Sequence, residues 1–148
     1  MPRITPADVG LLLIRLMLGV VFIYHGAPKL FGGLDGFAGF LGGLGVPLPT
    51  VAALLAALAE FLGGLLLIAG LYFRLALWPT VITMLVAAFM VHGHAFNVQD
   101  QGMEYTLTLA VMVAGLALTC PGALTVGRLL GRGAAGLGDG RDANPEVR

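Results

Sequence analysis

Four long apolar stretches constrain this chain more than any other feature of its sequence. They run from about residue 8 to 27, 50 to 72, 75 to 91 and 104 to 120. A helix of roughly 20 mostly apolar residues spans the ~30 Å hydrocarbon core of a bilayer. The loops between the stretches are short enough for an up-and-down arrangement. We therefore predict an all-α membrane protein, built as a four-transmembrane-helix bundle.

Composition supports membrane residence. Of the 148 residues, 58% are hydrophobic and only 11% are charged, whereas a soluble domain has about 25% charged residues. Zero net charge and the absence of a basic stripe argue against nucleic-acid binding. Cys120 is the single cysteine, which excludes an internal disulfide and a multi-cysteine metal site. We expect one transmembrane domain over residues 1–130 and a flexible cytoplasmic tail, rich in Gly, Asp and Arg, over residues 131–148.

The positive charges predict the orientation. Cytoplasmic loops of membrane proteins carry an excess of Lys and Arg, and the loop between the third and fourth stretches has neither. Lys29, in the first long loop, is the exception. We expect both termini in the cytoplasm and a multi-pass protein of the bacterial inner membrane. The arginines that support this orientation are Arg3, Arg74, Arg128, Arg132, Arg141 and Arg148.

The first apolar stretch and the loop after it need separate interpretations. The first stretch contains Arg15, and no small-residue cleavage motif follows it, so we expect a retained span and not a signal peptide. Residues 30–49 are rich in glycine and phenylalanine and almost uncharged. We predict a short interfacial helix in this extracytoplasmic loop, around residues 34–44.

Arg15 and Glu60 are ionisable residues inside apolar stretches. Burying either charge alone costs about 2.5–3.5 kcal/mol on insertion scales, so both should face the bundle interior. Spaced at 100° per residue, Arg15 shares a face with Gly19, Phe22 and Gly26, and Glu60 lies at the edge of a small-residue stripe. That stripe is formed by Ala52, Ala56, Ala59 and Gly63. We predict an Arg15–Glu60 ion pair, and leave open whether it only joins two helices or forms a proton-handling or ligand site.

A second polar group is expected at the extracytoplasmic end. It comprises His25, Lys29, His92, His94 and Glu104. Histidine can relay protons, bind metal or donate a hydrogen bond to a quinone carbonyl, while ordinary interfacial polarity explains the same residues. Haem ligation by His25 and His92 and zinc binding by His92, His94 and Glu104 lack further support, so we expect neither haem nor a metal.

The residues that carry these charges also resemble a known family. RLMLGVVFIYHGAPKLFG at 15–32, AEFLGGLLLIAGLYFRLA at 59–76 and EYTLTLAVMVAGLALTCPG at 104–122 are similar to the DoxX family of small bacterial membrane proteins. The resemblance implies a four-helix inner-membrane protein associated with quinone-linked or redox-stress oxidoreductases. It also implies that Arg15, Lys29, Glu60, His92 or His94, and Glu104 are the functional polar positions.

Three functions remain open on the sequence. The first is a membrane subunit or anchor of an oxidoreductase complex, with quinone as the candidate cofactor and a redox enzyme as the candidate partner. The second is a non-catalytic scaffold or assembly factor, and the third is a small proton-coupled transporter. A homo-oligomer is compatible with each. In the first reading the chain is a subunit and not a complete enzyme, because it has no cysteine pair and no cofactor motif.

Overall fold

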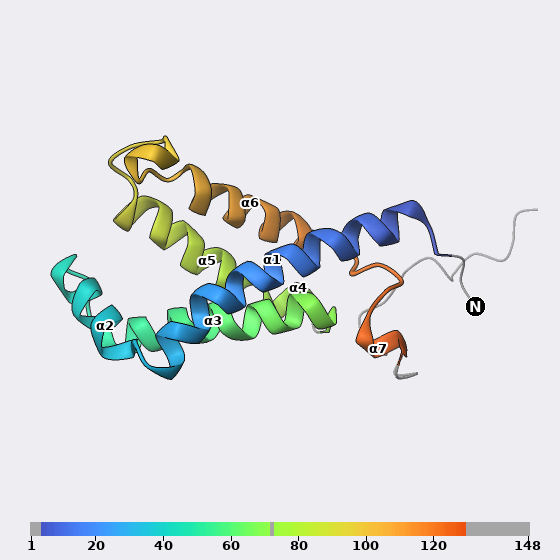
Figure 1. Cartoon of the computed structure of the whole chain (residues 1–148), viewed down its shortest axis with the longest axis horizontal. Helices are drawn as coiled ribbons and strands as arrows, with labels where there is room; N and C mark the ends of the chain where they lie inside the picture. Colours follow the sequence, from blue (N-terminus) through green and yellow to red (C-terminus); the bar gives the residue numbers. More distant parts are fainter. Residues whose placement is uncertain (1–3, 72, 130–148) are drawn as a thin grey trace, which may run out of the picture.

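The computed structural model describes residues 4–71 and 73–129, and every regular element in those residues is helical (Figure 1). The long elements are α1 (Pro6–Phe31), α3 (Pro49–Ala69), α5 (Trp78–Val86) and α6 (Glu104–Leu118). Shorter elements are α2 (Leu34–Gly43), α4 (Phe73–Ala76), α7 (Val126–Leu129), a π-helical turn (Ala87–Val91) and a 3-10 turn (Val98–Asp100). The all-α prediction is therefore confirmed for the described residues.

Local sequence explains where the two longest helices begin and end. Thr5 and Asp8 form a reciprocal capping box at the start of α1, each side chain bonded to the other residue's backbone N–H. Pro49 is the first residue of α3, where its missing N–H has no helical partner to lose. Gly70 ends α3 in the left-handed conformation, with φ of 66°, which favours glycine.

The helices form two pairs. α1 packs antiparallel to α3, α5 packs against α6, and α2 lies beside the start of α3. In Figure 1 the α5–α6 pair diverges from the α1–α3 pair toward the end that carries α2 and the loop before α6. The other end carries the start of α1 and α7. One apolar core joins α1, α3, α5 and α6, with Phe22, Leu67, Leu77 and Val113 almost fully buried.

Within residues 4–71 and 73–129, two helices are long and apolar enough to cross a membrane. These are α1, with 26 residues, and α3, with 21, or about 39 Å and 32 Å at 1.5 Å per residue. The third expected span is divided into α4, α5 and the π-helical turn, and α6 has 15 residues. All four long helices expose large apolar side chains, including Met17, Leu55, Ile82 and Val111. Such a surface is typical of a protein surrounded by lipid.

A helix also forms where the first loop was expected to contain one. α2 turns Ala38 and Leu41 toward Ala53 of α3 and leaves Phe40 exposed. Its place at a membrane interface remains a prediction. The expected tail, residues 131–148, and Arg3 lie outside the described residues.

Candidate functional site

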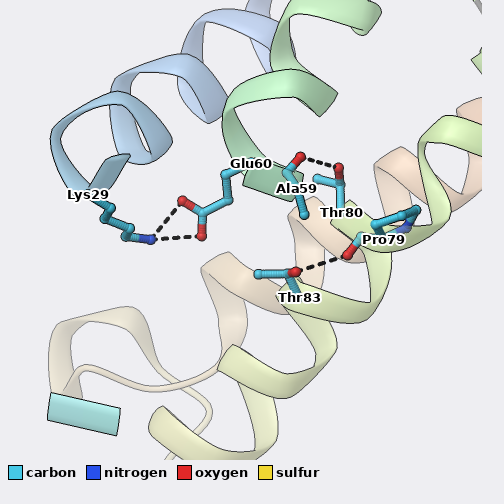
Figure 2. Close-up of polar contacts among 6 residues, drawn as sticks. All are labelled: Lys29, Ala59, Glu60, Pro79, Thr80 and Thr83. Atoms are coloured by element: carbon cyan, nitrogen blue, oxygen red, sulfur yellow. Dashed lines mark hydrogen bonds and ion pairs between the residues drawn. The ribbon is translucent and has the colours of Figure 1, made fainter. Parts of the chain in front are cut away.

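Glu60 forms a close ion pair with Lys29 of α1 (Figure 2). Lys29 Nζ lies 2.7 Å from both carboxylate oxygens of Glu60. The Glu60 side chain is 3% exposed and that of Lys29 is 27% exposed. The same ammonium lies 4.7 Å from the ring centroid of Phe37 in α2, close enough for a cation–π contact. The pair therefore connects three helices at one end of the bundle.

Glycines bring α1 and α3 close enough for this pair to form. A Cβ on Gly26 would lie 2.6 Å from the backbone nitrogen of Phe61, and a Cβ on Gly64 would lie 2.7 Å from the carbonyl oxygen of Gly19. No larger residue fits at either position without moving the backbone. This close approach is the usual role of small residues between membrane helices. It also fixes the register, with Gly19 opposite Gly64 and Gly26 opposite Phe61.

The predicted Arg15–Glu60 ion pair is wrong. In the observed register Arg15 lies beside Gly70, where an added Cβ would be 2.6 Å from Arg15 Nη1. Gly70 and Glu60 are ten residues apart on one helix, or about 15 Å. The first span was expected to end at about residue 27, but α1 continues to Phe31 and brings Lys29 opposite Glu60 instead.

Arg15 instead binds the chain that follows α6. Its guanidinium donates to the carbonyl oxygen of Pro121 at 2.5 Å and to that of Leu124 at 2.6 Å. Asp8, seven residues earlier on the same face of α1, accepts the backbone N–H of Ala123 at 2.6 Å. We call residues 121–125 the strap. Because Arg15 is fully buried under it, the arginine has an evident structural role at this end.

The predicted helix faces are confirmed for α1 and corrected for α3. Arg15, Gly19, Phe22 and Gly26 are all buried. On α3 the buried face is formed by Ala53, Ala57, Glu60, Gly63, Gly64 and Leu67, whereas Ala52, Ala56 and Ala59 are half-buried. Glu60 thus lies within the contact face and not at its edge.

The structure divides the predicted outer polar cluster. His92 Nδ1 lies 2.7 Å from the Gln101 carbonyl oxygen, and His94 Nε2 lies 3.0 Å from that of Asp100. Glu104 accepts the backbone N–H of Val98 at 3.1 Å. These three side chains therefore organise their own loop, residues 92–104. Among the described residues, no three His, Cys, Asp or Glu side chains are grouped to hold a metal ion.

The other two members of that cluster lie elsewhere. Lys29 belongs to the ion pair described above. His25 is exposed on α1 and contacts aromatic rings, edge-on to Tyr24 at 5.6 Å and tilted to Tyr105 of α6 at 6.5 Å.

Sequence reasoning missed three residues that shape these sites. Asp8 lies at the start of the first predicted span, and its spacing of seven from Arg15 is the sequence signal that the two share a face. Phe37 gave no signal, because its contact with Lys29 depends on how α2 folds back. Thr80 donates to the Ala59 carbonyl oxygen at 2.8 Å and packs where a Cβ on Gly63 would lie, joining α5 to α3.

A separate groove of about 310 Å³ lies between α3 and the segment formed by α4 and the start of α5. All its lining residues are apolar: Leu55, Leu58, Ala59, Leu62, Gly63, Leu66, Ala76 and Pro79. At 100° per residue, Leu55, Leu62 and Leu66 lie more than 100° around α3 from Glu60. The leucines of the groove therefore point away from the ion pair, and Gly63 lies where the two faces meet.

Residues 10–93, which contain both Arg15 and the Lys29–Glu60 pair, match the model of the family described as DoxX. The chain belongs to the DoxX family. The family resemblance inferred from the sequence motifs is thus confirmed, and DoxX membership makes this chain a membrane protein. No solved structure matches it.

Three curated relatives of this DoxX protein agree with that assignment. "Putative oxidoreductase CatD" of Bacillus subtilis is 37% identical over 76% of this chain and 80% of its own length. "Inner membrane protein YqjF" of Escherichia coli is 33% identical over 84% of this chain and 95% of its own length. "Inner membrane protein YphA" of Escherichia coli is 30% identical over 80% of this chain and 88% of its own length.

Proposed function

We propose that this DoxX protein is a four-span inner-membrane subunit of a quinone-linked oxidoreductase complex, and that Lys29 and Glu60 are its proton-handling groups. The observation that carries the proposal is the ion pair itself. Two charges in an apolar bundle are costly to desolvate, and their attraction offsets that cost only with good geometry. Intramembrane ionisable residues therefore mark functional sites more often than positions in a purely structural core.

The chemistry of the pair suits a quinone head group. Lys29 is a cationic donor for a carbonyl oxygen, and Glu60 is a carboxylate that can accept or return a proton. A bound quinone would supply the electron transfer, which neither side chain can perform. The apolar groove on α3 offers no donor and faces away from the pair, so a head group would be held at the Lys29 end of the bundle.

The name of one relative points in the same direction. "Putative oxidoreductase CatD" is 37% identical to this chain over 80% of that protein. The described residues hold no grouped metal ligands, and the sequence has one cysteine. The proposal includes a redox partner enzyme, which completes the complex.

The proposed topology places four spans in the membrane and both termini in the cytoplasm. The 92–104 loop has no Lys or Arg, whereas Arg74 and Arg128 belong to segments at the opposite end. Lys29 was the exception to the positive-inside pattern. In the structure Lys29 lies within the last turn of α1, paired with Glu60, and not in the loop that follows.

A second candidate, a non-catalytic scaffold, is favoured by a different observation. Four of the polar residues that the family resemblance points to form side-chain hydrogen bonds with backbone groups of this chain. These are Arg15, His92, His94 and Glu104. Such contacts stabilise a platform and need no ligand. The proton-coupled transporter receives less support, because both carboxylate oxygens of Glu60 already accept hydrogen bonds from Lys29.

Purification of the native protein tests the leading proposal. Lipid extraction followed by mass spectrometry should return quinone with the wild-type protein, and Glu60→Gln should lose it while keeping the helical circular dichroism spectrum. Asp35→Asn is the matched control, because Asp35 is an exposed carboxylate on α2. A folded wild-type protein that retains no quinone, but co-purifies with a partner even as Glu60→Gln, would favour the scaffold instead.

A further inference from the structure

The ion pair and the buried arginine are separated by a layer of apolar side chains. Between Lys29–Glu60 and Arg15, α1 contributes Leu18 and Phe22, and α3 contributes Leu67. These three side chains are 3%, 1% and 0% exposed. Leu77 beside α5 and Val113 of α6, both 0% exposed, belong to the same core. Interiors packed in this way leave few voids the size of a water molecule.

The Arg15 end is closed a second time by the strap. Two carbonyl groups of the strap accept hydrogen bonds from Arg15, and Asp8 holds the N–H of Ala123. Beneath the strap, an added Cβ on Gly70 would lie 2.6 Å from Arg15 Nη1 and 2.7 Å from a methyl group of Thr125. There is no room for even one more carbon atom at this point.

The Lys29 end is less enclosed. Lys29 keeps 27% of its side chain exposed although it bonds both oxygens of Glu60. It lies two residues before the end of α1, at the end of the molecule where the two helix pairs diverge. His25, four residues earlier on α1, is also exposed.

From this asymmetry we infer that the Lys29–Glu60 pair is accessible from one side of the membrane only. Protons, water and small polar molecules reach it through the Lys29 end, and the apolar layer with the Arg15-held strap closes the opposite end. This inference deepens the proposed function, since it states the side from which the site would exchange protons. In the proposed topology that side is extracytoplasmic.

The native sequence contains the two reporters that a test requires. Lys29 is its single lysine and Cys120 its single cysteine. Cys120 is exposed and precedes Pro121, to which Arg15 binds, so it reports the closed end. A membrane-impermeant sulfonated succinimidyl ester and an impermeant maleimide can therefore be applied to unmodified protein in right-side-out and inverted membrane vesicles. Peptide mapping distinguishes Lys29 from the chain's α-amino group.

We expect modification of Lys29 from one face only and of Cys120 from the other face only. Modification of Lys29 from both faces, or from the face that labels Cys120, would overturn the inference. Lack of modification from either face would also overturn it, once labelling in denaturing detergent shows that the reagent reaches Lys29. Glu60→Gln provides the second measurement, because a lysine freed from its partner should react faster from the same face and remain unreactive from the other.

Failure of this inference can be distinguished from failure of the proposed function. The labelling pattern depends only on packing and needs no bound quinone. One-sided labelling in a protein that retains no quinone would refute the function and keep the access route. Quinone retention with labelling of Lys29 from both faces would keep the proposed function and refute the one-sided access route.

Discussion

Removing the two members of the Lys29–Glu60 pair should destabilise the protein unequally. Lys29→Met and Glu60→Gln each replace a charge by a neutral side chain of similar shape. Lys29→Met leaves a carboxylate whose side chain is only 3% exposed, and an uncompensated buried charge costs about 3–5 kcal/mol. Glu60→Gln leaves a lysine that is 27% exposed and can extend its ammonium toward water. The lost charged hydrogen bonds then cost about 1.5–3 kcal/mol.

The double variant measures the coupling between them. With both charges gone, no buried charge is stranded, so Lys29→Met combined with Glu60→Gln should cost less than the sum of the single changes by about 1–3 kcal/mol. The assay is unfolding in mixed micelles with increasing sodium dodecyl sulfate, followed by circular dichroism. Asp35→Asn, on an exposed carboxylate of α2, controls for loss of negative charge. Additive costs, or a Glu60→Gln cost larger than that of Lys29→Met, would refute the reasoning.

Two further predictions concern helix packing and the strap. Gly64→Ala places a Cβ 2.7 Å from a backbone oxygen of α1, so it should cost about 1–3 kcal/mol in the same unfolding assay. Gly115→Ala on α6 meets nothing within 4 Å and should be neutral or stabilising; similar costs for both variants would contradict the packing. Arg15→Gln removes the guanidinium that holds two strap carbonyls, so hydrogen exchange at Ala123 should accelerate while exchange within α3 is unchanged. Unaltered protection of that amide would show that Arg15 does not hold the strap.

The sequence by itself determined the approximate places of the long helices and the class of protein, although not the division of the third span. Apolar stretches punctuated by Pro49, Gly70 and Pro121 are local signals, and local signals are sufficient to place helices because each helix satisfies its own backbone hydrogen bonds. The spacing of Arg15, Gly19, Phe22 and Gly26 also identified the buried face of α1, since a helix repeats every 3.6 residues whatever surrounds it.

Only the tertiary structure decided which charges meet. The register of α1 against α3 depends on contacts across the interface, above all Gly19 with Gly64 and Gly26 with Phe61. A shift by three turns would exchange the partner of Glu60, and no pattern within one helix reports that shift. In this register Lys29 forms the ion pair with Glu60. Arg15 instead donates hydrogen bonds to two carbonyl groups more than a hundred residues away in the chain. The ionisable residues were readable from the sequence, while their partners follow from how the helices pack.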